Sequence, residues 1–152
     1  MTVTGQMSRL TILMAEDDPD DRFLMDQAFL ELGDGWDLRF VEDGEELMNY
    51  LRRSGTYADH TVSPRPELIF LDLNMPKKDG RQALEEIKAD PDLVKIPVVI
   101  WTTSEDREDK VRCQAAGAED FVTKPVDFGE MVNSISKLVL RYSSQGNNSN
   151  PI

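Results

Sequence analysis

Three acidic residues of this sequence follow or interrupt apolar runs, where a surface carboxylate is not expected. Glu16 and Asp17 directly follow one apolar run, and Asp72 lies inside another, within residues 71–76 (LDLNMP). Carboxylates that gather in one place repel one another, and a hard divalent cation bound through oxygen removes that repulsion. These residues therefore predict a Mg²⁺ site. A carboxylate such as Asp72 can also act as a nucleophile towards a phosphoryl group.

Two further polar residues complete the set of candidates. Thr102 ends a third apolar run, and Lys124 follows a weaker one in the dipeptide Lys124-Pro125. The ammonium of Lys124 and a cation would neutralise the oxygens of a transferring phosphoryl group, to which Thr102 would donate a hydrogen bond. Taken alone, Asp72 is an ordinary turn residue, Thr102 a strand residue and Lys124 a solvated lysine. Their joint placement at strand ends favours the functional interpretation.

The acidic stretch at residues 16–20 (EDDPD) has two interpretations. For Asp18 and Asp20 we favour an ordinary loop and helix N-cap, since negative charge is stabilising at a helix N-terminus. For Glu16 and Asp17 alone, an acidic loop and a metal site are equally good interpretations. Only their position after a predicted strand separates them from their neighbours.

The elements that must position these residues follow from the hydrophobic pattern. Continuous apolar runs suit strands buried on both faces, and a 3.6-residue period suits amphipathic helices. Strands are predicted at 10–15, 68–73 and 97–102, with weaker ones at 37–41 and 121–123, and helices at 20–32, 44–53, 80–89, 107–116 and 128–142. This alternation predicts an α/β fold, a doubly wound five-stranded parallel sheet with five helices in three α/β/α layers. Functional residues gather at the carboxyl ends of such strands.

Two segments of the chain are less ordinary. The helix predicted at 107–116 has a thin apolar stripe, mainly Val111 and Ala115, so we expect it to dock weakly. Residues 143–152 (SSQGNNSNPI) are low in apolar content and predict a polar, disordered tail. No output domain is expected after residue 142.

Composition excludes several classes of function. The formal net charge of the 152 residues is −12, which argues against a nucleic-acid partner because phosphate backbones require a basic face. No apolar run is long enough to span a membrane. The single cysteine, Cys113, cannot form an internal disulfide, so a reducing cytoplasm is the expected location.

Taken together, these residues resemble the receiver domain of two-component response regulators, the CheY-like family, and a receiver domain is expected at 8–142. The resemblance rests on Glu16-Asp17, on residues 71–76 followed by Asp79-Gly80, on Thr102 and on Lys124-Pro125. Within the family the chain is most similar to small single-domain regulators that partner bacterial phytochromes. Residues 90–93 (DPDL), 102–104 (TTS) and 123–128 (TKPVDF) carry that closer similarity.

The resemblance implies a flavodoxin-like fold and a role for each site residue. Asp72 would accept a phosphoryl group from a sensor histidine kinase, such as a phytochrome, in a reaction that requires Mg²⁺. The metal would be held by Asp17, Asp72 and the backbone carbonyl of Asn74, with Glu16 acting mainly through water. No other cofactor is implied.

The resemblance also implies how the signal leaves the site. Thr102 and Lys124 would contact the phosphoryl group, and Phe121 matches an aromatic switch position that works with Thr102. The Lys124–Pro125 peptide bond is expected to be cis. The face formed by residues 107–142 is expected to bind a partner protein or a second copy of the chain. Such a protein is a phosphoacceptor rather than an enzyme, and catalyses only its own phosphotransfer and slow autodephosphorylation.

Three rival functions are open to test. An aspartyl phosphatase of the haloacid-dehalogenase type requires a second Asp two residues after the nucleophile, as a general acid and base. This chain has Asn74 at that position. A nucleotide-binding module would need a glycine-rich phosphate loop after a strand, and none is present. A pseudo-receiver would lack the intact acidic pair and Asp72.

Overall fold

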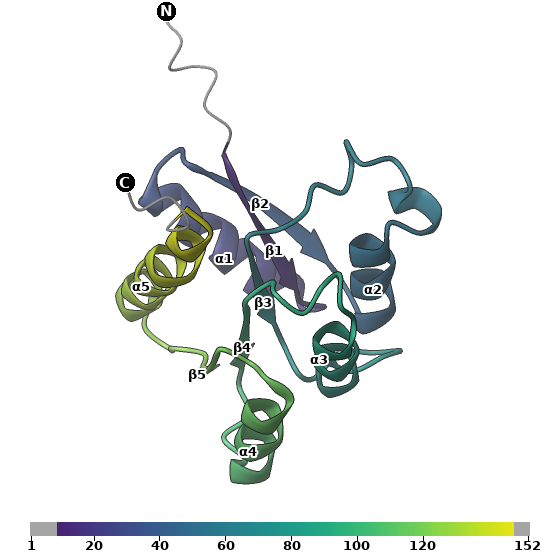
Figure 1. Ribbon diagram of the computed structural model, residues 1–152. Helices are drawn as coiled ribbons and strands as arrows, with labels where there is room; N and C mark the ends of the chain where they lie inside the picture. Colours follow the sequence, from purple (N-terminus) through teal and green to yellow (C-terminus); the bar gives the residue numbers. More distant parts are fainter. Residues whose placement is uncertain (1–8, 148–152) are drawn as a thin grey trace, which may run out of the picture.

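The computed structural model describes residues 9–147, with side chains described up to Tyr142. Five strands form one parallel sheet in the order β2-β1-β3-β4-β5, which is the flavodoxin-like order (Figure 1). The strands are β1 (Leu10–Ala15), β2 (Trp36–Val41), β3 (Leu68–Leu71), β4 (Val98–Thr102) and β5 (Asp120–Thr123). The predicted α/β fold is confirmed.

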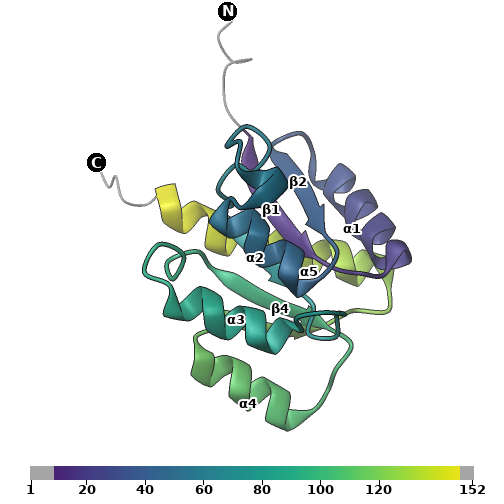
Figure 2. The same ribbon diagram turned by 90° about the vertical axis from the view of Figure 1, so that its right-hand side faces the viewer.

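The helices cover both faces of the sheet, with α1 and α5 on one face and α2, α3 and α4 on the other (Figures 1 and 2). They are α1 (Pro19–Leu32), α2 (Gly44–Arg52), α3 (Gly80–Ala89), α4 (Arg107–Ala116) and α5 (Phe128–Asn147), with a short 3-10 helix η2 (Gly55–Tyr57). The first four helices each follow an aspartate whose side chain accepts a hydrogen bond from a backbone N–H of the first turn. Such N-caps fix where a helix begins. These aspartates are Asp18, Asp43, Asp79 and Asp106.

The sheet separates two apolar layers, because side chains alternate along each strand. In β3, Ile69 and Leu71 belong to the core under α2, α3 and α4, whereas Phe70 belongs to the core under α1 and α5. Phe70 meets Trp101 of β4 edge-on, with ring centroids 5.6 Å apart. The central strands are buried on both faces, which explains their continuous apolar runs.

Three sequence expectations need correction. Helix α5 continues to Asn147, so the predicted disordered tail is wrong for residues 143–147, while 148–152 lie outside the described residues. In α4 the fully buried side chain is Cys113, whereas Val111 is 56% exposed and Ala115 is also exposed. No cis peptide bond occurs within residues 9–147, so Lys124–Pro125 is trans. Among those residues, no helix has the length and apolar character needed to cross a membrane.

Candidate functional site

The ends of β1 and β3 bring the predicted carboxylates together. Ala15 pairs with Leu71 in the sheet, and the backbone N–H of Asp72 donates to the carbonyl of Ala15 at 3.2 Å. Glu16 and Asp72 therefore follow neighbouring strands at the same level, and they are only 1% and 5% exposed. With the exposed Asp17 they place one oxygen each within 4.8 Å of one another.

Lys124 follows β5 and reaches across the edge of the sheet to these carboxylates. Its Nζ donates to Glu16 Oε1 at 2.7 Å and to Asp21 Oδ2 at 2.7 Å, and lies 3.6 Å from Asp72 Oδ2. Its backbone N–H donates to the carbonyl of Thr102 at 2.8 Å, which fixes the start of this loop against β4. The predicted lysine therefore lies in the carboxylate site and not in solvent.

Burial and charge shift the pKa values of this site. Burial raises the pKa of Glu16 to about 7; the hydrogen bond from Lys124 opposes that rise, and the charge of Asp72 adds to it. Burial alone would lower the pKa of Lys124, but its hydrogen bonds to Asp21 and Glu16 outweigh this effect and raise it above its usual range. Three carboxyl groups, those of Glu16, Asp21 and Asp72, thus surround the single ammonium of Lys124.

A hard divalent cation fits this arrangement. Glu16, Asp17 and Asp72 offer only oxygen ligands, and two of the three are shielded from water. Mg²⁺ and similar ions are bound in proteins by one or two carboxylates and retain several waters. The donor set and the unbalanced charge both agree with the predicted metal site.

Thr102 and Asn74 are two further predicted site residues, and they make different contacts. Thr102 is fully buried, and its Oγ1 accepts a hydrogen bond from the backbone N–H of Ser104 at 3.3 Å. Asn74 is exposed, and its backbone N–H approaches Asp72 Oδ1 at 3.4 Å. The loop after β3 therefore turns back towards the Asp72 carboxylate.

The close packing of α3 fixes the backbone of that loop. The N–H of Gly80 donates to the carbonyl of Leu73 at 3.0 Å. A Cβ on Gly80 would lie 2.2 Å from the carbonyl oxygen of Asp72. Glycine is therefore required at the first position of α3 if Asp72 is to keep its place.

Phe121, the predicted switch residue, lies in β5 away from the carboxylates. Its ring is half-buried and packs against the core beneath α2, α3 and α4. It also lines a surface groove with Val111 and Gln114 of α4. Phe121 thus lies in the edge strand β5, next to α4.

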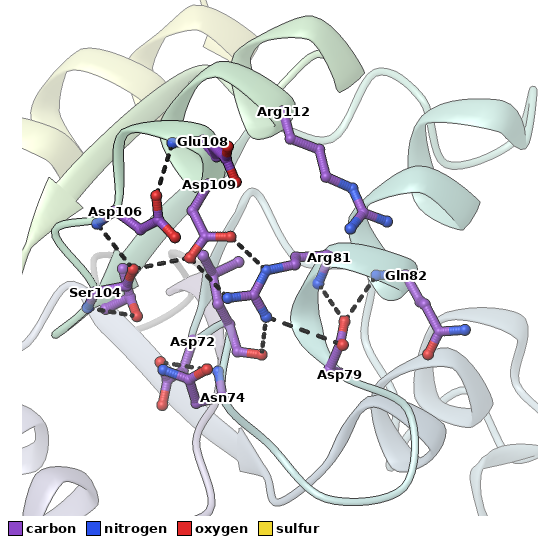
Figure 3. A network of polar contacts seen from close by, with 12 residues as sticks. Asp72, Asn74, Asp79, Arg81, Gln82, Ser104, Asp106, Glu108, Asp109 and Arg112 are labelled. Atoms are coloured by element: carbon purple, nitrogen blue, oxygen red, sulfur yellow. Dashed lines mark hydrogen bonds and ion pairs between the residues drawn. The ribbon is translucent and has the colours of Figure 1, made fainter.

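Several contacts in and around the site were missed from the sequence. Asp21 pairs with Lys124, although an acidic residue in the first turn of a helix has an ordinary capping explanation. Arg81 of α3 forms a two-pronged ion pair with Asp109 of α4, and Asp109 also accepts from Ser104 (Figure 3). No local sequence signal pairs two helices in this way, since the partners lie far apart in the chain.

The fold and the site together define a class: doubly wound α/β domains with carboxylates and a lysine at the carboxyl edge of the sheet. The model of the response regulator receiver domain matches residues 12–136, and the chain belongs to that family. The resemblance found from the sequence is confirmed.

Similar proteins agree with this assignment. Response regulator Rcp1 of Synechocystis sp. is 39% identical over 132 residues, covering 85% of this chain and 88% of the relative. The structure resembles the phosphorylated cyanobacterial phytochrome response regulator RcpA, with a TM-score of 0.83 and 35% identity over 91% of this chain and 96% of the other. It also resembles the Mn²⁺-bound form of Rcp1, with a TM-score of 0.77 and 35% identity over 86% and 91% of the two chains.

Proposed function

We propose that this protein is a phosphoacceptor switch in which Asp72 takes a phosphoryl group from a sensor histidine kinase, with Mg²⁺ bound beside it. One observation carries the proposal. The ammonium of Lys124 lies 2.7 Å from Glu16 Oε1 and 3.6 Å from Asp72 Oδ2, at a buried edge of the sheet. Fixed positive charge next to a sheltered carboxylate suits charge that develops on a phosphoryl group.

In the proposed transfer, a carboxylate oxygen of Asp72 attacks the phosphorus atom of a phosphohistidine. A P–O bond forms as the P–N bond breaks, and the electron pair returns to the imidazole nitrogen. Lys124 turns from Asp21 towards the new phosphoryl oxygens, and the hydroxyl of Thr102 donates to one of them. Lys124 already lies in the site, and its backbone N–H donates to the carbonyl of Thr102, which holds the two residues side by side.

Asp17, Asp72 and the backbone carbonyl of Asn74 are the proposed metal ligands, with Glu16 acting through water. When bound, Mg²⁺ would supply positive charge to the phosphoryl oxygens. The clustering of Glu16, Asp17 and Asp72 supports this choice. The Mn²⁺-bound form of the relative Rcp1 supports it by similarity.

The proposed phosphodonor is a kinase of the phytochrome type, by similarity to the phytochrome response regulator RcpA. Two exposed apolar side chains each lie two residues along the chain from a partner in the Asp21–Lys124 ion pair and suit protein docking: Phe23 on α1 and Val126 in the loop before α5. The ion pair of Asp21 with Lys124 joins these two segments. A kinase seated on both would reach Asp72.

The proposed output surface is the face of residues 107–142, which would bind a partner protein or a second copy of the chain. Phosphorylation would draw Thr102 towards Asp72, and the ring of Phe121 would follow into the space behind it. The groove that Phe121 shares with Val111 and Gln114 would then change shape. Phosphoryl must favour one of two arrangements for this to act as a switch.

The test is phosphorylation by acetyl phosphate with Mg²⁺, followed by intact mass. Wild-type protein should gain one labile phosphoryl group, Asp72→Asn should gain none while keeping its fold, and the exposed Asp92→Asn should behave as wild type. Gain of phosphoryl by Asp72→Asn would refute the assignment. Continuous release of phosphate from an aryl phosphate would instead favour a phosphatase, and no mass gain in wild type would favour a binding scaffold.

A further inference from the structure

Helices α3 and α4 are joined by a sheltered ion pair near the site. Arg81 Nε donates to Asp109 Oδ1 at 2.6 Å and Arg81 Nη2 to Asp109 Oδ2 at 2.7 Å (Figure 3). The two side chains are only 19% and 13% exposed. Two parallel hydrogen bonds between a guanidinium and a carboxylate fix orientation as well as distance. Arg81 therefore fixes the first turn of α4 relative to α3.

The same carboxylate holds the loop that carries Thr102. Ser104 Oγ donates to Asp109 Oδ2 at 2.8 Å, and the backbone N–H of Ser104 donates to Thr102 Oγ1 at 3.3 Å. The hydroxyl of Ser104 also accepts from the N–H of Asp106 at 3.2 Å. A continuous chain of hydrogen bonds thus runs from Arg81 to the buried hydroxyl of Thr102.

Arg81 is also connected to the other side of the site. Its Nη1 lies 3.5 Å from the carbonyl oxygen of Leu73, the residue after Asp72. Arg81 therefore contacts the loop after β3 and, through Asp109, the loop after β4. These are the two loops that leave Asp72 and Thr102.

Little else holds α4 in place. Cys113 is its one fully buried residue, and Val111 is 56% exposed. A second ion pair joins Arg112 to Glu85 of α3, but both side chains are about half exposed, at 49% and 47%, and it does not reach the loop. Polar contacts therefore dominate how α4 is docked.

We infer that Arg81, Asp109 and Ser104 form a clamp that holds the loop after β4 in the arrangement where Ser104 engages the Thr102 hydroxyl. This inference rests on the proposed function, because the clamp opposes movement of Thr102 towards a phosphoryl group on Asp72. Ser104 lies two residues after Thr102, so that movement displaces Ser104 from Asp109. The three are positioning residues, and the strength of the clamp sets how readily phosphoryl shifts the equilibrium.

The experiment measures affinity for beryllofluoride, a phosphoryl mimic, in Mg²⁺ by calorimetry. Ser104→Ala removes the hydrogen bond to Asp109 without changing charge, and Arg81→Gln removes the paired hydrogen bonds between the guanidinium and Asp109. Each should bind the mimic more tightly by about threefold or more, within the range by which residues along a coupling route change it. Loss of a positive charge or of structure would weaken binding of this anion, so tighter binding distinguishes the clamp from both.

Matched variants complete the test. Arg112→Gln removes the same charge from the exposed α3–α4 pair and should leave the affinity for the mimic unchanged. Ser104→Thr keeps the hydroxyl that Ser104→Ala removes, so its affinity should equal that of wild type. Hydrogen exchange without the mimic should show lost protection at the start of α4 in Arg81→Gln but not in Arg112→Gln. Unchanged or weaker binding by Ser104→Ala and Arg81→Gln would overturn the clamp. Failure of wild type to bind the mimic would instead overturn the proposed function.

Discussion

Lys124 Nζ lies closer to Asp21 than to Asp72, at 2.7 Å from Asp21 Oδ2 and 3.6 Å from Asp72 Oδ2. The lysine is thus held on the α1 side of the site by a residue that has no proposed contact with metal or phosphoryl. In the proposed function, Asp21 would compete with the phosphoryl group for the same ammonium. Its side chain is 30% exposed, so it can be released to water at modest cost.

Asp21→Asn should therefore tighten binding of beryllofluoride by about twofold to fivefold, the range expected for a partly exposed ion pair. Removal of any nearby negative charge also favours an anion, so the control is Asp20→Asn in the same helical turn. Asp20 is exposed, and its backbone N–H donates to the capping Asp18. Equal gains in the two variants, measured by calorimetry, would show a general charge effect and not release of Lys124.

Lys124→Ala should destabilise the metal-free protein at pH 8. Glu16 and Asp72 would remain buried without a counter-ion, and loss of one partner of a buried pair costs about 3 kcal/mol or more. Mg²⁺ would replace the missing charge, so it should raise the melting temperature of the variant more than that of wild type. Thermal melts with and without Mg²⁺ test this. A smaller Mg²⁺ effect in Lys124→Ala would contradict the charge argument.

Gly80→Ala should disturb the site through the backbone. The new Cβ would lie 2.2 Å from the Asp72 carbonyl oxygen and 2.8 Å from the Leu73 Cα, so the loop or the helix must shift. We expect a loss of about 2 kcal/mol or more in the free energy of unfolding and slower phosphorylation by acetyl phosphate. Gly35→Ala is the control, because nothing lies within 4 Å of its Cβ. Equal stability of the two variants in urea would refute the close approach.

Cys113 should be unreactive in the folded protein. Burial raises the pKa of its thiol to about 11, and the charge of Asp109 adds to the effect, so little thiolate forms at pH 8. Alkylation of native protein should be slow and that of denatured protein fast. Rapid labelling of the native protein, measured by mass, would mean that α4 opens readily.

The same shift predicts a pH dependence of stability. Above pH 9 the unfolded thiol ionises while the folded thiol keeps its proton, so the unfolded state is favoured as the pH rises to about 11. The loss is up to about 3 kcal/mol. Cys113→Ala should lack this component, which urea titrations at several pH values would reveal.

The central part of the fold could be predicted because β1, β3 and β4 are covered on both faces and so read as unbroken apolar runs. The clustering of Glu16 with Asp72 could be predicted too, since parallel strands end at one edge. The end of α5 could not, because the polar residues after Tyr142 carry no signal that distinguishes the end of a helix from a tail.

The contacts between helices could not be predicted from the sequence for a different reason. Periodicity favoured Val111 as the docking residue of α4, but the helix turns Cys113 inward and leaves Val111 exposed. The side of a short helix that faces the core depends on the contacts that hold the helix in place. Here the main contact is the ion pair of Arg81 with Asp109. That pairing spans two elements whose relative position only the folded structure defines.

The polar docking of α4 has a thermal consequence. Heat capacity changes when apolar surface enters or leaves water, and α4 buries only Cys113 fully. Release of this helix should therefore carry a small heat-capacity change, unlike global unfolding, which exposes both cores. The enthalpy of release would then be nearly constant, and its free energy nearly linear in temperature. Cooling or warming would move this equilibrium steadily, without the curvature that governs the stability of the whole domain.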